Sequence, residues 1–352
     1  MTEQRCDFEL NRPGALIAAL PAVLGFVPEQ SLVLAAIDDG ELGPVLRVDL
    51  APDLGDRLHQ LVDVAAGAAP EAVIAVIVDA EGARCPGCGL DYRALCDALT
   101  GLLARRGIAL WAAHVVDRVA AGGRWHCVDG CGSEGSVDDP SASPLAVAAV
   151  LEGRRLYQRR ADLQGVVAVA DPARCDRLAA AVREHAPARA AAHDADPTGC
   201  ARRDVESMLA AAARIADGAT LDDDALVPLA CALTDVQVRD TLYALAVGET
   251  AAAAESLWAT LAQTLPEPGR AEALVLLAFS AYVRGDGPLA GVALDAALRG
   301  RPGHRMAGML DTALQAGLRP ERIRELASTG YQLADRLGVR LPSRRSFRRR
   351  KS

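Results

Sequence analysis

The sequence predicts an α/β fold: an N-terminal α/β sandwich with a mixed sheet, followed by an all-α, tetratricopeptide-like helical domain. Strand-like and helix-like segments alternate over the first half of the chain, whereas apolar residues follow helical spacing throughout the second half. We expect the α/β domain at residues 1–190, the helical domain at 200–342 and a basic disordered tail at 343–352. The polar segment 189–199, which contains alanine and proline, is the predicted linker.

Two neighbouring strands open the α/β domain. The segments 31–37 (SLVLAAI) and 45–50 (VLRVDL) are strand-like, and the turn-forming sequence Asp38-Asp39-Gly40 lies between them. The sequence therefore predicts a β-hairpin.

Helices and strands then alternate. Helical spacing of apolar residues predicts helices, and short continuous apolar runs predict buried strands. In chain order, the predicted elements are a helix at 54–66, a strand at 72–78, a helix at 92–106, a strand at 109–116 and a helix at 143–151. The order β-β-α-β-α-β of the elements up to residue 116 is typical of an α/β sandwich with a mixed sheet.

One stretch of the second half matches the pattern of small and large residues in a tetratricopeptide repeat. The matching residues are Leu274, Leu277, Ala278, Ala281, Ala290, Leu294, Ala297 and Pro302, with Gly285 and Asp286 at the turn between two helices. A single repeat cannot bury its own apolar face, so neighbouring helices must complete the core. A generic α-helical domain is the alternative.

Composition bears on the compartment. Apolar runs are broken by proline, glycine or charge before the roughly 18–20 residues that span a bilayer. The longest early run, Ala15 to Val27, contains Pro21 and follows acidic residues, so no signal peptide is predicted. Nine cysteines without a secretory signal favour reduced thiols or a metal site over a disulfide scaffold. We therefore expect a cytoplasmic protein without a transmembrane segment.

Charge and lysine content exclude several classes of protein. The net charge of −8 argues against broad affinity for nucleic acid, except through the basic tail from Arg344 to Lys351. Lys351 is the only lysine, which excludes enzymes that need a lysine Schiff base or a P-loop lysine in a folded pocket. The sequence also lacks the nucleophile-elbow, His-Glu-x-x-His and EF-hand motifs.

Two close cysteine pairs are the strongest metal candidate. Cys85 and Cys88 lie in Cys-Pro-Gly-Cys-Gly, and Cys127 and Cys131 lie in Cys-Val-Asp-Gly-Cys-Gly. Four thiolates would hold a structural zinc ion tetrahedrally, and the glycine after each pair permits the turn that such a site needs. Two alternatives stay open: a redox-active or disulfide-forming pair, and thiols that only pack. His126 is a further candidate ligand, although a histidine beside a tryptophan more often stacks or forms a hydrogen bond.

Polar side chains at strand ends are the second candidate site. Ser31, Arg47, Asp49 and Asp79 lie in or next to the predicted strands. Charged groups in such places either line a ligand pocket at the end of the sheet or pair with one another. We expect pairing between arginine and aspartate, with a ligand pocket as the alternative.

The chain resembles a bacterial family over most of its length. The matching residues are Leu20, Pro21, Leu24, Gly25, Phe26, Pro28, Ser31, Leu32, Val33, Arg47, Asp49 and Leu50, followed by Arg124, Trp125, Cys127, Cys131 and Gly135. Residues 273–318 resemble the tail of the same family, which is named domain of unknown function 4192. Where members of that family often have adjacent cysteines and a proline, this chain has Cys131-Gly132-Ser133. The resemblance supports the predicted architecture and implies no activity.

Two functions are compatible with these observations. The first is a non-enzymatic protein-interaction or regulatory protein, in which the helical domain binds a protein partner. The second is an enzyme or small-ligand binder with a pocket at the strand ends of the α/β domain. The sequence alone does not decide whether the chain is an enzyme.

Overall fold

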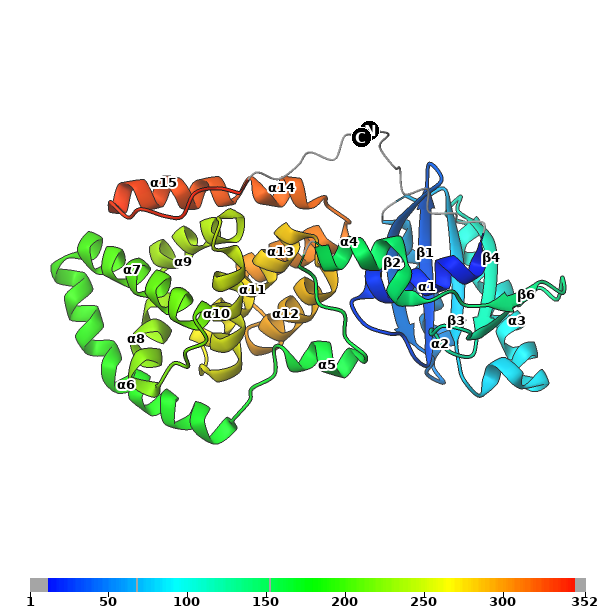
Figure 1. Ribbon diagram of the computed structural model, residues 1–352, viewed down its shortest axis with the longest axis horizontal. Helices are drawn as coiled ribbons and strands as arrows, with labels where there is room; N and C mark the ends of the chain where they lie inside the picture. Colours follow the sequence, from blue (N-terminus) through cyan, green and yellow to red (C-terminus); the bar gives the residue numbers. More distant parts are fainter. Residues whose placement is uncertain (1–11, 68, 152, 346–352) are drawn as a thin grey trace. The chain divides into compact units, whose positions relative to one another are not determined.

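The computed structural model describes residues 12–345, except residues 68 and 152 (Figure 1). The chain forms two compact units that divide between Asp162 and Leu163, with residues 315–317 grouped with the first unit. The division falls earlier than the expected domain boundary at 190–200. The predicted linker is itself largely helical, because it contains the end of α6 (Pro172–Ala195) and the start of α7 (Pro197–Ala216). Its alanines favour a helix, and Asp196 caps α7 by accepting a hydrogen bond from the Gly199 N–H.

A six-stranded mixed sheet organises the first unit. Its strand order is β2-β1-β3-β4-β5-β6, in which the β3–β4 pair is parallel and the other neighbours are antiparallel. The strands are β1 (Ser31–Asp38), β2 (Glu41–Asp49), β3 (Ala72–Val78), β4 (Ala109–Val116), β5 (Arg124–Cys127) and β6 (Glu134–Ser136). The predicted α/β class with a mixed sheet is confirmed, and the predicted hairpin is the β1–β2 pair.

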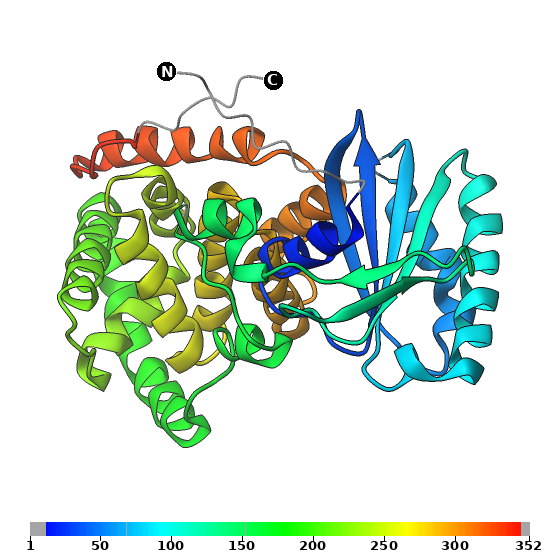
Figure 2. The same cartoon turned by 45° about the vertical axis from the view of Figure 1, so that its right-hand side comes forward.

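Helices cover both faces of this sheet, with α1 and α3 on opposite sides (Figure 2). The helices of the first unit are α1 (Pro13–Leu24), α2 (Leu54–Ala66), α3 (Pro86–Ala104) and α4 (Pro144–Leu151), with short 3₁₀ turns η1 (Gly82–Arg84) and η2 (Pro140–Ala142). On one face, apolar residues of α2 and α3 pack against β1 and β3 in one buried cluster. Every residue of β3 is buried, as expected for a central strand covered on both faces.

Two helices of the first unit differ from the sequence-based expectation. No element was predicted over α1, which is apolar on all sides and contains Pro21, so it shows no amphipathic pattern. Its close approach to β6 requires Gly14, because a Cβ there would collide with the carbonyl oxygen of Ser136. Helix α3 begins at Pro86 rather than at residue 92, because Pro86 occupies its first turn and Cys85 caps it.

The two edge strands of the sheet are β2 and β6. Strand β2 is only partly buried and contains Pro44, and the register of the β1–β2 pair shifts between Ala35 and Ile37. Strand β6 has only three residues.

The second unit is helical in its described residues. Its helices are α6, α7, α8 (Asp223–Leu233), α9 (Val236–Leu242), α10 (Ala251–Thr264), α11 (Gly269–Arg284), α12 (Gly287–Gly300), α13 (Arg305–Gln315), α14 (Pro320–Arg324) and α15 (Ala327–Leu337), with the 3₁₀ turn η3 (Tyr243–Val247). Helix α5 (Arg160–Gly165) spans the boundary between the units.

Helix α11 forms the centre of the second unit. Every residue from Ala271 to Val283 is buried. Its C-terminus is closed by Gly285, whose φ of 88° suits glycine, and Asp286 then caps α12. A helix buried on all sides, rather than along one stripe, is typical of the middle of a globular helical core.

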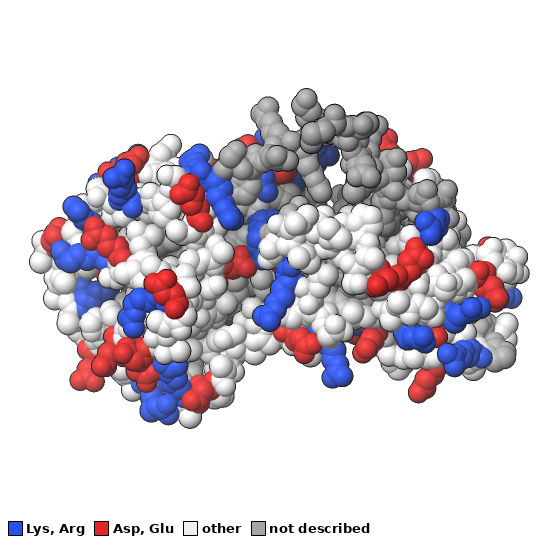
Figure 3. Space-filling view, in the orientation of Figure 1, with Lys and Arg blue, Asp and Glu red and all other residues white. Residues whose placement is uncertain are grey.

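The predicted basic tail lies largely outside the described residues, which end at residue 345. Within them, the Arg344 guanidinium lies 4.5 Å from the centre of the Tyr331 ring. Acidic and basic side chains are interspersed on the face shown in Figure 3. Among the described residues, the search for a helix long and apolar enough to cross a membrane finds none.

Candidate functional site

Ser31, Arg47, Asp49 and Asp79 all lie at one end of the sheet. Ser31 pairs with Asp49 on one side and, on the other, with the last residue of β3, which precedes Asp79. The Ser31 hydroxyl donates to the carbonyl oxygen of Glu29 at 2.5 Å. Arg47 donates to the same oxygen at 3.2 Å and forms an ion pair with Asp49 at 2.5 Å. These groups are therefore bonded within the protein.

Asp79 closes the turn after β3. Its carboxylate accepts hydrogen bonds at 3.0 Å from the backbone N–H groups of Glu81 and Gly82 and from the Gln30 side chain, and it also accepts one from the Tyr92 hydroxyl. Burial opposes its ionisation, but the hydrogen bonds prevail, that from Gly82 foremost, and lower the pKa of Asp79. This carboxylate anchors the turn and the first part of α3.

The second cysteine pair lies on a loop held by α3. Cys127 ends β5, and residues 128–133 lead into β6. The Nε of Arg93 donates to the Val128 carbonyl oxygen at 3.2 Å, and its guanidinium lies beside Gly130. Gly130 has a φ of 75°, a conformation that glycine adopts without strain. The loop thus has a defined shape at the point where its thiols lie.

Cys127, Asp129 and Cys131 form the group of metal-ligating side chains found among the described residues. One ligand atom from each lies within 4.8 Å of the other two. Ligands of a tetrahedral zinc ion stand roughly 3.3–3.8 Å apart, given Zn–S of about 2.3 Å and Zn–N or Zn–O of about 2.0–2.1 Å. The three atoms can therefore reach one ion with small side-chain movements.

Hydrogen bonds, burial and charge on this loop shift the pKa values of Asp129 and Cys127, two of the three candidate ligands. Asp129 accepts a hydrogen bond from the Cys131 N–H at 2.9 Å, and this bond lowers the pKa of Asp129. Burial, the neighbouring Cys131 thiol and negative charge raise the pKa of Cys127 to about 12. A cation placed between these groups would reverse the effect on the thiol, because a coordinating thiol is deprotonated.

His114 lies at the edge of this group. It faces Cys127 across the β4–β5 pair, with 3.5 Å between its Nδ1 and the Cys127 Sγ. That distance is close to the roughly 3.5 Å expected between a nitrogen and a sulfur ligand of one tetrahedral zinc ion. His114 is buried, packs edge-on against Trp125, and has a lowered pKa because burial disfavours its charged form. His114 approaches Cys127 but does not belong to the group whose ligand atoms all lie within 4.8 Å of one another.

Cys85 and Cys88 do not belong to that metal-ligating group. They lie at the N-terminus of α3, where the Cys85 sulfur accepts a hydrogen bond from the Cys88 N–H at 3.5 Å. Cys85 is exposed and Cys88 is half-buried. The two cysteine pairs therefore have different surroundings. Cys85 and Cys88 lie at the start of helix α3, whereas Cys127 and Cys131 flank Asp129 on a loop.

A cavity of about 290 Å³ lies between α3 and the cysteine loop. Gly89, Tyr92 and Arg93 line it from α3, and Cys127 and Glu134 are among the residues that line it from the other side. His126 also lines this cavity, and it belongs neither to the metal-ligating group nor to the contacts of His114.

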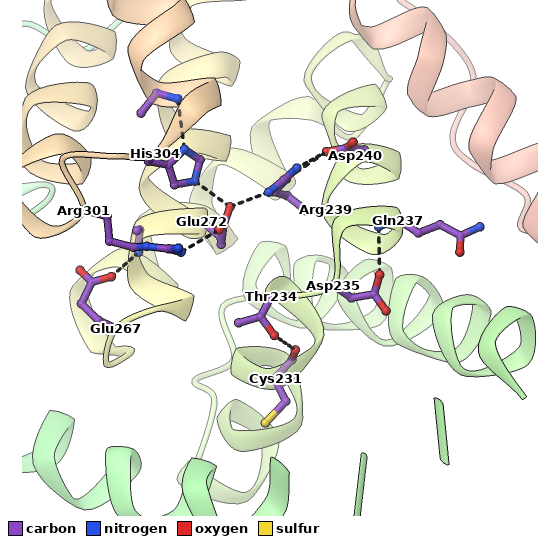
Figure 4. Close-up of polar contacts among 12 residues, drawn as sticks. Cys231, Thr234, Asp235, Gln237, Arg239, Asp240, Glu267, Glu272, Arg301 and His304 are labelled. Atoms are coloured by element: carbon purple, nitrogen blue, oxygen red, sulfur yellow. Dashed lines mark hydrogen bonds and ion pairs between the residues drawn. The ribbon is translucent and has the colours of Figure 1, made fainter. Parts of the chain in front are cut away.

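A buried polar cluster in the second unit is centred on Glu272 (Figure 4). This carboxylate contacts His304 at 2.9 Å, Arg239 at 3.3 Å and Arg301 at 3.2 Å. The other ring nitrogen of His304 accepts from the Ala307 N–H at 3.2 Å, so its Nε2 is the one that donates to Glu272. Each charged group of the cluster has a partner within the second unit, so these residues stabilise the packing of its helices.

Sequence reasoning missed Asp129 and His114. Asp129 is visible in the sequence between the two cysteines, and its position two residues from each is the signal that could have identified it. His114 carries no such signal, because its neighbour Cys127 is set by the register of two strands.

The comparisons with known proteins concern the chain as a whole. Searches of curated proteins and of solved structures return no match. The sequence model of one family, described as a domain of unknown function (DUF4192), matches residues 13–321, a range that covers parts of both compact units and ends within α14. The chain therefore belongs to the DUF4192 family, as the matching residues in segments 20–50 and 124–135 indicated.

Proposed function

We propose that this chain is a non-enzymatic regulatory protein whose α/β unit binds a zinc-type ion and whose helical unit binds a protein partner. One observation carries the first part: Cys127, Asp129 and Cys131 present ligand atoms within 4.8 Å of one another. His114 lies outside this group but is 3.5 Å from the Cys127 sulfur, and we propose that it moves in to become the fourth ligand when an ion binds.

The donor set favours zinc over other common ions. Two thiolates, an imidazole and a carboxylate suit a borderline-soft ion, whereas calcium and magnesium prefer oxygen ligands alone. Three of the four ligands come from one loop and its flanking strand, so ion binding would order the loop that Arg93 holds against α3. Coupling of ion binding to loop order is a means of regulation.

Metal titration of the full chain tests this proposal. We expect one zinc ion per chain, measured by competition with a chromophoric chelator under reducing conditions. Cys131→Ser should weaken binding by more than the roughly 10–100-fold that loss of an outer contact costs. Cys175→Ser removes a half-buried thiol of α6 and is the matched control. Equal affinity of the wild type and Cys131→Ser would refute the proposal.

The same titration decides between two ligand sets. The sequence suggested a four-thiolate site made of Cys85, Cys88, Cys127 and Cys131. If Cys88→Ser weakens zinc binding as strongly as Cys131→Ser, that set holds; if only Cys131→Ser does, the ion is bound by the loop and His114.

The second part of the proposal concerns a tetratricopeptide-like helical unit. The small residues Ala278 and Ala281 of α11, and Ala290 and Ala297 of α12, are all buried, in support of a close helix pair of that kind. Because α11 is buried on all sides, a binding groove must lie elsewhere in the unit.

A groove of about 610 Å³ offers such a place, between α7, α10 and residues 340–343. Apolar residues, including Leu209, Leu245 and Ala253, contribute much of its lining, and its charged lining residues are Asp217, Glu249 and Arg340, with a net charge of −1. Its lining fits an apolar peptide segment that carries a basic residue.

Selection from a displayed peptide library tests this groove. Peptides selected on the wild type should be apolar with a lysine or arginine, and Glu249→Lys should shift the selection toward acidic residues. Selected peptides that bind Leu209→Asp as well as they bind the wild type would place their site outside the groove.

The alternative function is an enzyme or small-ligand binder at Ser31, Arg47, Asp49 and Asp79. The contacts of these side chains with Glu29, with one another and with Tyr92 argue against it. One observation favours it: the buried Nε of Arg47 has no hydrogen-bond partner among the described residues.

A reducing, cytoplasmic location is supported by the eight cysteines of the described segment, which are free thiols.

A further inference from the structure

Cys85 and Cys88 form a pair of thiols at the first turn of a long helix. Cys85 is the N-cap of the 19-residue helix α3, and its extended backbone (φ −94°, ψ 116°) turns its side chain back toward the helix. Its sulfur accepts from the Cys88 N–H at 3.5 Å, and the Cys88 thiol is hydrogen-bonded to it as well. Residues three apart on a helix are neighbours, at a separation that a disulfide can bridge with a small adjustment.

The two thiols differ in the way that a reactive pair requires. Cys85 is exposed, whereas Cys88 is half-buried and packs against the core beneath α3. The backbone N–H of Cys88, the Cys88 thiol and the N–H of Gly87 lower the pKa of Cys85. The Cys85 hydrogen bond and burial raise the pKa of Cys88, and the negative charge of Asp79 adds to this. An exposed thiol with an accessible thiolate form is the attacking group in thiol–disulfide exchange, and a protected neighbour resolves the intermediate.

Cys85 is accessible to a second molecule, because its side chain is exposed. The cavity of about 290 Å³ next to α3 is lined by Gly89, directly after Cys88, and by neither cysteine. Gly87 and Gly89 place no side chain over the first turn of the helix. Pro86 occupies the first helical position, where it leaves the hydrogen bond to the Cys85 sulfur undisturbed.

We propose that Cys85 and Cys88 are a redox-active dithiol that exchanges with low-molecular-weight disulfides. The Cys85 thiolate attacks one sulfur of the disulfide RS–SR, forming a Cys85–SR bond and releasing RS⁻. The Cys88 thiol then loses its proton to solvent and attacks the Cys85 sulfur, which releases the second RS⁻. The dithiol loses two electrons and becomes a Cys85–Cys88 disulfide, and the small disulfide gains them and becomes two thiols.

The sequence provides a direct readout of this reaction. Trypsin cleavage after Arg84 and Arg93 isolates both thiols in one peptide, CPGCGLDYR, apart from the other cysteines. The full chain, treated with a metal chelator, is equilibrated with mixtures of reduced and oxidised glutathione, quenched with acid and alkylated. We expect this peptide to change from doubly alkylated to internally oxidised as the mixture becomes more oxidising.

Two variants test the assigned roles. Cys88→Ser should accumulate a Cys85–glutathione mixed disulfide, because the resolving thiol is gone. Cys85→Ser should accumulate several-fold less of the mixed disulfide at Cys88, because the Cys88 thiol is half-buried and packs against the core beneath α3. Cys175→Ser is the control and should behave as the wild type.

Three results would overturn the inference. The first is equal trapping of glutathione in Cys85→Ser and Cys88→Ser. The second is a CPGCGLDYR peptide that stays doubly alkylated across the whole redox series. The third concerns zinc. If zinc protects this peptide from alkylation as fully as it protects Cys127 and Cys131, the two pairs share one ion and the dithiol assignment also fails. The zinc proposal depends on Cys131→Ser instead, so the two proposals fail independently.

Discussion

Replacing Glu272 tests how much a buried ionic cluster stabilises the helical unit. Glu272→Gln keeps the shape of the side chain but removes its charge and turns one acceptor oxygen into a donor facing Arg239 or His304. The carboxylate side chain is 6% exposed and contacts three cationic or donor groups at 2.9–3.3 Å. Arg239 keeps its contact with Asp240 at 2.8 Å, which limits the loss.

The expected magnitude follows from these contacts. Hydrogen bonds to charged groups contribute about 1.5–3 kcal/mol each, and breaking a buried ion pair costs about 3–5 kcal/mol. With partial compensation by Asp240 and by the remaining amide oxygen, we expect Glu272→Gln to lower the free energy of unfolding by about 2–4 kcal/mol. For a unit of this size, that loss corresponds to roughly 4–16 °C in Tm.

Urea unfolding followed by far-ultraviolet circular dichroism measures this loss, because most helices lie in the second unit. Glu321→Gln is the matched control: Glu321 also pairs with an arginine, Arg324, but is 61% exposed, so its loss should cost under about 1 kcal/mol. If both variants lose the same free energy within about 0.5 kcal/mol, the buried cluster makes no net contribution, and the reasoning is refuted.

The pH dependence of the same variant provides a second check. Burial opposes ionisation of Glu272, but His304 and Arg239 outweigh it and lower its pKa below the ordinary value of 4.5. The stabilisation is therefore complete above about pH 4.5 and is lost as the pH falls toward the pKa of the folded state. The difference in unfolding free energy between the wild type and Glu272→Gln should therefore shrink as the pH falls below about 4.5.

Three further substitutions test local features of the first unit. Asp79→Asn should lower the free energy of unfolding by about 1–3 kcal/mol, because the turn after β3 loses charged hydrogen bonds; a neutral effect in thermal unfolding would contradict this role. Since the pKa of Asp79 is lowered by folding, its contribution should likewise disappear as the pH falls below the ordinary aspartate pKa. Gly14→Ala should cost about 1–3 kcal/mol by forcing α1 away from Ser136, whereas wild-type stability would show that the helix shifts freely. Arg93→Ala should leave the fold intact by circular dichroism but weaken zinc binding roughly tenfold, and unchanged affinity would mean that the loop needs no support from α3.

Several elements of the α/β unit were predictable because a single strong pattern specified each. The strands at 72–78 and 109–116 coincide with β3 and β4, since each is a short apolar run bounded by polar or turn-forming residues. Helix α2 matches the prediction because one face alone is apolar. Helix α1 was not predicted because it is apolar on all sides. The segment 189–199 is predicted as a linker but is largely helical, because a polar, alanine-rich sequence is compatible with both.

The candidate site was only half visible in the sequence. Spacing identified the two cysteine pairs, and it led to the expectation that all four thiols meet. His114 reaches Cys127 through strand register, which local spacing does not contain. The Cys85 cap of α3 is a local contact, but spacing alone does not tell whether this pair meets the other cysteines.

The edge strands of the sheet bear on how this protein associates with others. An unprotected edge presents free N–H and C=O groups that invite a strand from another molecule, as in fibril growth. At one edge, Pro44 removes a donor from β2 and the register shift bends its pairing; at the other, β6 is too short to template a long strand. Both edge strands therefore disfavour the addition of a strand from another molecule. We expect the sheet not to grow into cross-β aggregates, and partners to bind through side chains on the surface instead.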